Sequence, residues 1–291
     1  MNNSLCAALG DFDGIHLGHV AVIKTAVFES QTMTPAVYTF CKNCKNAPII
    51  TDIETKKRIL TSLGIKKIIF EDFEKIKALS PLSFIRDILY NKNGIRKIVC
   101  GSDFRFGKNA EGDVCILKNI CEDIGIELII VELRQEDGKK ISSTDIRNLI
   151  SNGKVESVNS LLGRNYSITG KVLHGKNLGN KKHAPTVNIS FTEGALIPAY
   201  GVYITRTIIN DKIYNSISNI GIRPSVETTD KPNIETNIFD FNEDIYGEYI
   251  TVEFLKMIRP EIKFSNTTEL FNQIHKDIAY AKEFFIGEKN V

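Results

Sequence analysis

Short apolar runs alternate with amphipathic segments along the first half of the chain. The runs have the length of buried strands and occupy residues 4–9, 36–40, 67–70, 97–100 and 127–131. Apolar residues at helical spacing lie between them, from Val20 to Val27 and within residues 53–63, 81–90 and 114–124. This alternation predicts a parallel sheet with right-handed crossovers and a ligand crevice at the carboxyl ends of its strands.

The pattern changes after a last helical segment at residues 154–162. Segments typical of strands, separated by Gly, Asn, Asp and Pro, follow at residues 166–173, 186–190, 201–209, 213–220, 234–239 and 249–257. They predict a small antiparallel barrel. Apolar residues at intervals of three and four then predict a final helix with one apolar face, formed by Leu270, Ile274, Ile278, Ala281 and Phe285.

We therefore expect two domains of different architecture. Residues 1–163 form an α/β domain, and residues 164–291 form a β-barrel with a terminal helix. The chain has 291 residues, of which 42% are hydrophobic, and this is enough to bury two cores of ordinary size.

Charge and composition limit the functional classes to which this protein can belong. The formal net charge is +2, from 37 basic and 35 acidic residues, and lacks the basic excess of a protein that binds nucleic-acid phosphates. No apolar run approaches the roughly 20 residues needed to span a bilayer, and the N-terminus does not show the pattern of a secretion signal. We expect a cytoplasmic protein that binds neither nucleic acid nor membrane. Small anionic molecules remain possible ligands.

All six cysteines lie within the first 121 residues, at Cys6, Cys41, Cys44, Cys100, Cys115 and Cys121. Several fall inside apolar runs, so we expect reduced thiols rather than a disulfide framework. Cys41 and Cys44 have the spacing of a metal or redox pair. No second pair follows at zinc-finger distance, so a structural zinc site is the minor alternative.

The first stretch with candidate chemistry is residues 10–19, at the predicted turn from a strand to a helix. Its glycines allow backbone to approach a ligand closely, and the amides of the first helical turn attract phosphate. Two imidazoles could donate hydrogen bonds to phosphate oxygens as charge develops. Each histidine alone could simply form the turn, but the whole stretch predicts a nucleotide site that contains Gly10, Phe12, Gly14, His16, Gly18 and His19.

Residues 141–147 combine hydroxyl side chains with an arginine at the start of a probable helix. Such a combination is common at ordinary helix N-termini. Placed opposite the first motif, however, Ser142, Ser143, Thr144 and Arg147 could clamp a triphosphate.

Residues 100–107 form a glycine-bounded loop after a predicted strand. Its aromatic side chains could serve packing alone. Alternatively, Phe104 and Phe106 lie against a flat heterocycle while Arg105 pairs with phosphate.

The second half contains a glycine-rich stretch, with Gly170, Gly175 and Gly179, followed by a predicted strand. It could be an ordinary hairpin loop, or a loop that covers phosphates. Thr186 and Asn188 are two residues apart, so they share one strand face and offer the hard oxygen ligands that suit magnesium.

Together these motifs resemble the bacterial bifunctional riboflavin kinase/FAD synthetase family. The resemblance extends from Leu5 to about Phe285 and rests on four motifs: Gly-x-Phe-Asp-Gly-x-His-x-Gly-His at residues 10–19, Gly-x-Asp-Phe-Arg-Phe-Gly at residues 101–107, Ser-Ser-Thr-x-Ile-Arg at residues 142–147 and Pro-Thr-x-Asn at residues 185–188. It implies a Rossmann-like nucleotidylyltransferase domain and a riboflavin kinase-like barrel. The implied activities are ATP-dependent phosphorylation of riboflavin to FMN, with Mg²⁺, and adenylylation of FMN to FAD with release of pyrophosphate.

The resemblance also implies roles for individual residues. His16, His19 and the 142–147 segment would hold the phosphates of ATP in adenylyl transfer. The flavin would contact Asp103, Phe104, Arg105, Phe106, Arg223 and Arg259. Glu235 matches the catalytic glutamate of the kinase and would take a proton from the attacking ribityl hydroxyl. For Arg259, an ion pair at the end of a strand is an equally open alternative.

The chain departs from the family pattern at three places. Asp145 stands where a basic residue is common, Ser225 replaces a threonine, and residues 182–184 read Lys-His-Ala before Pro185. Two other functions therefore stay open. One is a related adenylyl- or cytidylyltransferase with another acceptor, which would not explain the barrel motifs. The other is a flavin-binding or regulatory protein that has lost one or both activities.

Overall fold

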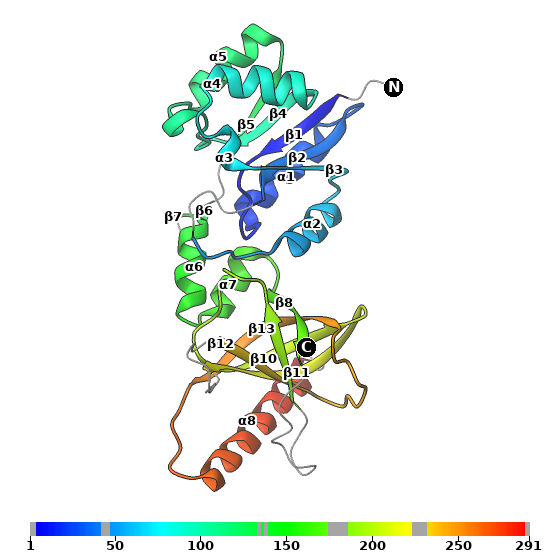
Figure 1. Cartoon of the computed structure of the whole chain (residues 1–291), viewed down its shortest axis with the longest axis vertical. Helices are drawn as coiled ribbons and strands as arrows, with labels where there is room; N and C mark the ends of the chain where they lie inside the picture. Colours follow the sequence, from blue (N-terminus) through cyan, green and yellow to red (C-terminus); the bar gives the residue numbers. More distant parts are fainter. Residues whose placement is uncertain are drawn as a thin grey trace. The chain divides into compact units, whose positions relative to one another are not determined.

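The structure is a computed structural model that describes residues 4–41, 47–132, 135–136, 139–173, 186–222 and 232–288. The chain divides into two compact units, Met1–Asp145 and Ile146–Val291 (Figure 1). The predicted architectures are confirmed: a parallel sheet with helices in the first unit, and a closed antiparallel barrel with a final helix in the second.

The first unit is built on a five-stranded parallel sheet in the order β3-β2-β1-β4-β5. Its strands are β1 (Leu5–Leu9), β2 (Thr34–Phe40), β3 (Lys67–Glu71), β4 (Ile95–Gly101) and β5 (Glu127–Val131). Its helices are α1 (Leu17–Phe28), α2 (Ile53–Ser62), α3 (Phe73–Ile76), α4 (Pro81–Ser83), the π-helix η1 (Phe84–Lys92), the 3₁₀ helix η2 (Lys108–Ala110) and α5 (Val114–Ile124). A hairpin of β6 (Gln135–Glu136) and β7 (Lys139–Lys140) precedes α6 (Ser143–Ser151), in which the division between the units falls.

Alternate strand residues fill two separate cores, one on each face of this sheet. In β1, Leu5, Ala7 and Leu9 belong to the core that η1 and α5 cover, whereas Cys6 and Ala8 belong to the core that α1 and α2 cover. This separation follows from the two-residue period of a strand, and burial on both faces is typical of parallel sheets. The apolar runs in the sequence are continuous for the same reason.

The strand order reverses between β1 and β4. β1 pairs in parallel with both β2 and β4, and Ala7 lies opposite Ala36 on one side and Ile98 on the other. In open α/β sheets, ligands bind outside the carboxyl ends of the strands at such a reversal. The segments that leave these two carboxyl ends are residues 10–16 and residues 102–107, which are the first and third sequence motifs.

The second unit is a closed barrel with the strand order β10-β11-β12-β9-β8-β13, in which all the described pairings are antiparallel. Its strands are β8 (Tyr166–Leu173), β9 (Thr186–Phe191), β10 (Gly201–Ile209), β11 (Lys212–Ile222), β12 (Pro232–Ile238) and β13 (Tyr249–Pro260). Helix α7 (Val155–Leu162) precedes the barrel, and α8 (Thr267–Glu288) follows it.

Strands β10 and β11 bury hydroxyl side chains on the side that faces away from α8. Ile204 and Ile217 pack in the core shared with α8, so the residues next to them point to the opposite side. There, fully buried hydroxyls form a chain of hydrogen bonds of 2.8 or 2.9 Å through Thr205, Ser216, Ser218 and Thr236. Because these hydroxyls bond to one another, the cost of burying them is offset.

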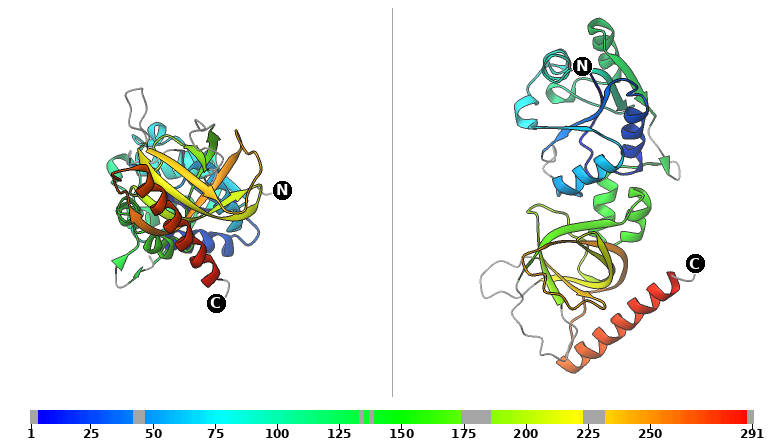
Figure 2. Two further views of the ribbon diagram at one scale, coloured as in Figure 1. Left: turned by 90° about the horizontal axis from the view of Figure 1, so that it is seen from below. Right: turned by 90° about the vertical axis from the view of Figure 1, so that its right-hand side faces the viewer.

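Helix α8 packs on the outside of the barrel through its C-terminal half (Figure 2). Ala281 and Phe285 are buried there and Ile278 is partly buried, as the apolar repeat predicts. Ile274, one turn earlier in the same repeat, is exposed. The predicted apolar face is therefore longer than the face that the barrel covers.

Helix α7 is hydrogen-bonded to the barrel within the second unit. Asn159 donates to the carbonyl of Phe254 at 2.9 Å and accepts from the amide of Tyr166 at 2.7 Å. The compact units accordingly divide at residue 145. The boundary between residues 163 and 164 that the sequence suggests for the two functional domains stays a prediction.

Burial separates the thiols of the described cysteines into two groups, and this generates a labelling prediction. Cys44, the second residue of the possible metal or redox pair, lies outside the described residues. Burial raises the pKa of Cys6 and Cys121 to about 11 and that of Cys100 to about 12, so these thiols hold their protons at neutral pH. Cys41 and Cys115 are exposed and free. Iodoacetamide should therefore alkylate Cys41 and Cys115 first in the native protein near neutral pH. Peptide mass spectrometry measures this, with urea-unfolded protein as the control in which the three buried thiols react as well. Equal native rates at Cys100 and Cys115 would contradict the assignment.

Candidate functional site

The turn between β1 and α1 adopts a backbone conformation that most side chains avoid. Phe12 and Ile15 have φ angles of 50° and 41°, and Gly14 between them has a φ angle of 85°. Glycine adopts this region without penalty, but each of the other two residues costs on the order of 1–3 kcal/mol. Phe12 and Ile15 are both buried in the core beneath α1, and this packing helps to hold the turn.

Polar contacts from distant segments also fix this turn. The carboxylate of Asp13, which is only 3% exposed, accepts hydrogen bonds from the amides of Ile50 and Thr51 at 3.1 and 3.2 Å. The carbonyl of Asp11 accepts from the Thr39 hydroxyl at 2.7 Å and from the Lys56 ammonium at 2.9 Å. None of these anchoring side chains was identified from the sequence, because they lie outside the motif or, in the case of Asp13, have no ligand-like pattern of their own.

His16 and His19 lie together at the N-terminus of α1. Nδ1 of His16 accepts a hydrogen bond from the amide of His19 at 3.3 Å, and the two rings stack with centroids 3.6 Å apart. A neutral His16 ring whose Nδ1 accepts carries its proton on Nε2. Phe12 packs edge-on against His19 at 5.3 Å. Gly10 directly follows β1 and Gly18 lies in the first turn of α1, so all residues of this motif lie along one strand-to-helix connection.

The 142–147 segment meets the turn directly. The Ser143 hydroxyl donates to the carbonyl of Asp13 at 3.0 Å, which joins two motifs that are far apart in the sequence. Ser142 accepts from the amide of Asp145 at 3.1 Å and donates to its carboxylate at 2.6 Å, so Asp145 is directed at Ser142. Thr144 is exposed in the first turn of α6, and Arg147 follows one turn later on the same helix.

The loop after β4 presents its two aromatic residues differently. Phe106 is buried, packs against Phe84 and stacks on the partly buried Phe104 with centroids 5.6 Å apart. Arg105 is exposed and lies 3.7 Å from Asp113. Asp103 forms an ion pair with Lys140, which immediately precedes the 141–147 segment. This contact brings the predicted flavin loop next to the predicted phosphate segment, and Lys140 is a member of the site that sequence reasoning missed.

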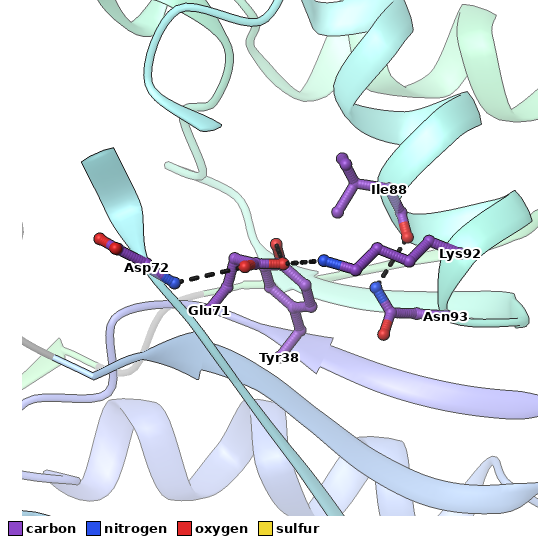
Figure 3. A network of polar contacts seen from close by, with 6 residues as sticks. All are labelled: Tyr38, Glu71, Asp72, Ile88, Lys92 and Asn93. Carbon is purple, nitrogen blue, oxygen red and sulfur yellow. Dashed lines mark hydrogen bonds and ion pairs between the residues drawn. The ribbon is translucent and has the colours of Figure 1, made fainter. Parts of the chain in front are cut away.

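A further polar cluster lies at the carboxyl end of β3 (Figure 3). The carboxylate of Glu71 accepts from the Lys92 ammonium at 2.9 Å and from the Tyr38 hydroxyl at 3.4 Å. Burial, reinforced by the Glu71 charge, raises the pKa of Tyr38 well above its usual range. Asn93 closes the same end of η1 by donating to the carbonyl of Ile88 at 2.8 Å. These contacts join β2 and β3 to η1.

In the barrel, Glu235 and Asn188 lie directly opposite each other on β12 and β9. The Asn233 amide donates to Asn188 Oδ1 at 2.8 Å and to Glu235 Oε1 at 3.1 Å, so it bridges the two predicted site residues. Thr186 lies opposite Asn237 on the same pair of strands, so Thr186 and Asn188 on β9 share one outward face with Glu235 and Asn237 on β12. The two-residue period of the sequence Asn-Ile-Glu-Thr-Asn could have identified Asn233.

This face can hold a hard cation through oxygen ligands. Thr186 supplies a hydroxyl and Asn188 an amide oxygen, which suit Mg²⁺ shared with substrate phosphates, and the carboxylate of Glu235 lies opposite Asn188. Among the described residues no group of three or more His, Cys, Asp or Glu side chains could hold a metal by itself. The fit therefore depends on the neutral oxygens of Thr186 and Asn188.

The remaining residues predicted for the barrel site are Gly170, Gly175, Gly179, Arg223 and Arg259. Gly170 on β8 lies so close to β9 that a Cβ would collide with the carbonyl of Ser190. Gly175, Gly179 and Arg223 lie outside the described residues, as do residues 182–184 and Ser225. For Arg259 the sequence left two alternatives, a flavin contact or an ion pair at the end of a strand, and the structure contains the ion pair. Nη2 of Arg259 lies 2.8 Å from the carboxylate of Asp277 on α8.

Comparison with known proteins agrees with both halves of this picture. The family model for FAD synthetase matches residues 1–145, and the family model for riboflavin kinase matches residues 162–285. Bifunctional riboflavin kinase/FMN adenylyltransferase from Bacillus subtilis is 37% identical over 96% of this chain and 92% of its own length. The protein with that name from Escherichia coli K12 is 30% identical over 95% of this chain and 91% of its own length. This chain belongs to the bifunctional riboflavin kinase/FMN adenylyltransferase family.

The function of this family member is two consecutive steps of flavin biosynthesis. ATP phosphorylates riboflavin to FMN, and a second ATP adenylylates FMN to FAD with release of pyrophosphate. Riboflavin, FMN, ATP and FAD are thus its substrates and products, and use of nucleotide and metal is a property of the family.

A solved structure shares the fold of nearly the whole chain. It is described as a macrolide-efflux protein from Streptococcus pneumoniae, covers 96% of this chain and 94% of its own, and has a TM-score of 0.86 at 30% identity. In the described part of this riboflavin kinase/FMN adenylyltransferase chain, no helix has the length and apolarity to cross a membrane.

The ion pair of Arg259 with Asp277 should contribute strongly to barrel stability. The two side chains are 15% and 5% exposed, and Gln273 also donates to Asp277 at 2.8 Å. Asp277→Asn removes the charge that balances a largely buried guanidinium, so we expect the free energy of unfolding to fall by about 3–5 kcal/mol. Urea unfolding followed by circular dichroism measures the change.

The matched control is the other ion pair between the barrel and α8. Arg206 and Glu288 lie 2.8 Å apart with side chains 33% and 39% exposed, so Glu288→Gln should cost less than about 1 kcal/mol. Equal losses in the two variants would show that burial does not govern the strength of these pairs.

Proposed function

We propose that each unit of the chain carries one of the two activities. The FAD synthetase match ends at residue 145, where the first compact unit ends. The riboflavin kinase match begins at residue 162, next to the predicted domain boundary at residues 163 and 164, and lies wholly within the second unit.

The free thiols of the described cysteines and the use of ATP support the predicted cytoplasmic location.

The observation that carries the kinase assignment is the cross-strand placement of Glu235 against Asn188. Glu235 is the proposed general base, which accepts the proton of the terminal ribityl hydroxyl while that oxygen attacks the γ-phosphorus of ATP. The bond from that phosphorus to the oxygen that bridges it to the β-phosphorus breaks, and ADP leaves. Thr186 and Asn188 are the proposed ligands of Mg²⁺. When bound, Mg²⁺ neutralises phosphate charge that develops during the transfer. Gly170, Gly175 and Gly179 stay predicted contacts of the nucleotide, and Arg223 and Arg259 stay predicted contacts of the flavin.

In the first unit, we propose that an FMN phosphate oxygen attacks the α-phosphorus of ATP in line. The bond from that phosphorus to the bridging oxygen breaks, and pyrophosphate leaves without a covalent enzyme intermediate. His16 and His19 stabilise the phosphate charges by position, and Arg147, on the part of α6 beyond residue 145, stays a predicted contact of the phosphates. Thr144 adds a hydroxyl and the first turn of α6 adds its amides, while Ser142, Gly10, Gly14 and Gly18 shape the phosphate cradle. Ser143 stays a predicted contact of the nucleotide, and its hydroxyl holds the carbonyl of Asp13. The bond between Ser143 and Asp13, which joins the two phosphate motifs, supports this assignment.

The loop after β4 is the proposed flavin contact of the adenylyltransferase. Phe104 lies on the buried Phe106 and offers a flat apolar surface to an isoalloxazine ring. Arg105 is exposed and suits the FMN phosphate, and Asp103 is held at the loop by Lys140.

Single substitutions should separate the two activities. With riboflavin, Mg²⁺ and ATP, His19→Ala should accumulate FMN and lower FAD formation about 100-fold or more, because it removes a group aimed at the phosphates. Glu235→Ala should lower FMN formation by a similar factor and leave the conversion of supplied FMN to FAD unchanged, because it removes only the kinase base. Separation of the flavins by chromatography measures both steps.

Two exposed residues serve as controls for this test. His275→Ala on α8 and Glu243→Ala should change neither step. Loss of both activities in either site variant would argue against two independent sites. If the unsubstituted protein forms FMN but no FAD, it is a kinase alone, and flavin binding without conversion would favour a binding protein.

A further inference from the structure

Helix α2 buries a lysine that belongs to none of the sequence motifs. Lys56 is only 5% exposed, and its ammonium donates to the carbonyl of Asp11 at 2.9 Å. Its neighbour Lys57 is an ordinary surface residue with a 46% exposed side chain, which pairs with Glu54 at 2.8 Å. Lysine is seldom fully buried, since removing an ammonium from water is costly.

The carbonyl that Lys56 holds lies in the turn that carries the two histidines. Asp11 directly precedes Phe12, the first residue of the turn with a left-handed backbone, and the turn leads to His16 and the first helical amides. A conformation of this kind persists only where surrounding contacts determine it. On the Asp11 side those contacts include the Lys56 ammonium and the Thr39 hydroxyl, and on the Asp13 side they include Ser143, Ile50 and Thr51.

The positive charge of Lys56 also favours the binding of an anion at the β1–α1 turn. The N-terminus of α1, a helix of 12 residues, already favours an anion next to this turn. Lys56 adds a buried positive charge beside the turn, which itself carries the carboxylates of Asp11 and Asp13. A triphosphate that binds at the turn therefore meets a site whose backbone and charge are fixed before it arrives.

We propose that Lys56 is a positioning residue of adenylyl transfer. By holding the Asp11 carbonyl, its ammonium keeps the β1–α1 turn in the strained conformation that aims His16 and His19 at the phosphates of ATP. The inference rests on the proposed function of the first unit, but the placement of the turn can be measured without any activity.

The test compares Lys56→Met with Lys56→Arg and with Lys57→Met as the matched control. Lys56→Met should lower kcat for FAD formation by about 10- to 100-fold, because small displacements of positioning groups have effects of that size. Riboflavin phosphorylation in the same protein should stay unchanged, and Lys56→Arg should restore part of the lost rate. Lys57→Met should match the unsubstituted protein in both steps.

Hydrogen exchange supplies the readout that does not depend on activity. In Lys56→Met the amides of residues 12–19 should exchange faster than in the unsubstituted protein, while those of α5 should not change. If the unsubstituted protein makes no FAD, the proposed function fails, and the exchange measurement still decides the role of Lys56.

Other outcomes would overturn the proposal. FAD formation in Lys56→Met within twofold of the unsubstituted rate would do so, and so would equal losses of adenylyl transfer and kinase activity. If Lys56→Met does not fold, Thr39→Val removes a second side-chain donor to the Asp11 carbonyl and should also slow FAD formation selectively. An unchanged rate in that variant would then contradict a requirement for a fixed Asp11 carbonyl.

Discussion

The turn between β1 and α1 holds a conformation that its own residues resist, and the candidate adenylyltransferase site depends on the contacts that keep it there. Phe12 and Ile15 would relax from the left-handed region if they were free. Their burial in the core under α1 and the anchoring of Asp11 and Asp13 prevent this. The sheet makes the anchoring possible, since β2 delivers Thr39 to the same carboxyl edge at which β1 ends. The position of the histidines is thus a property of the whole α/β unit.

The barrel positions its site by simpler means. One side of β12 contributes Thr236 to the buried chain of hydroxyls, and the other side carries Glu235 to the face shared with Asn188. Because side chains alternate along a strand, the packing of the buried side fixes the register of the outward side. A slip of one residue would exchange the buried and the outward side chains of β12, so the site geometry depends on the packing of the barrel interior.

Periodicity in the sequence was sufficient for the fold but not for the site. The alternation of runs predicts the parallel sheet and the barrel, both of which are confirmed, because burial on the two sheet faces and on one helix face leaves a direct pattern in the chain. Candidate residues such as Glu235 came from resemblance, since a glutamate on a strand has no local signal of its own. Lys56 and Asn233 were missed. Lys56 meets its partner across 45 positions of sequence, and only the tertiary arrangement reveals such a contact. The exposed Ile274 shows the converse, an apolar repeat longer than the surface that covers it.

Helix α8 is attached to the barrel by two ion pairs that respond differently to dissolved salt. The pair of Arg259 and Asp277 is largely shielded from solvent. The pair of Arg206 and Glu288, near the C-terminal end of the helix, is exposed to solvent. Mobile ions screen exposed charges over a Debye length of about 8 Å at physiological ionic strength and reach buried pairs much less. Rising ionic strength therefore weakens the ion pair at the C-terminal end of α8 first, while the buried Ala281 and Phe285 and the shielded pair at Asp277 keep the helix on the barrel.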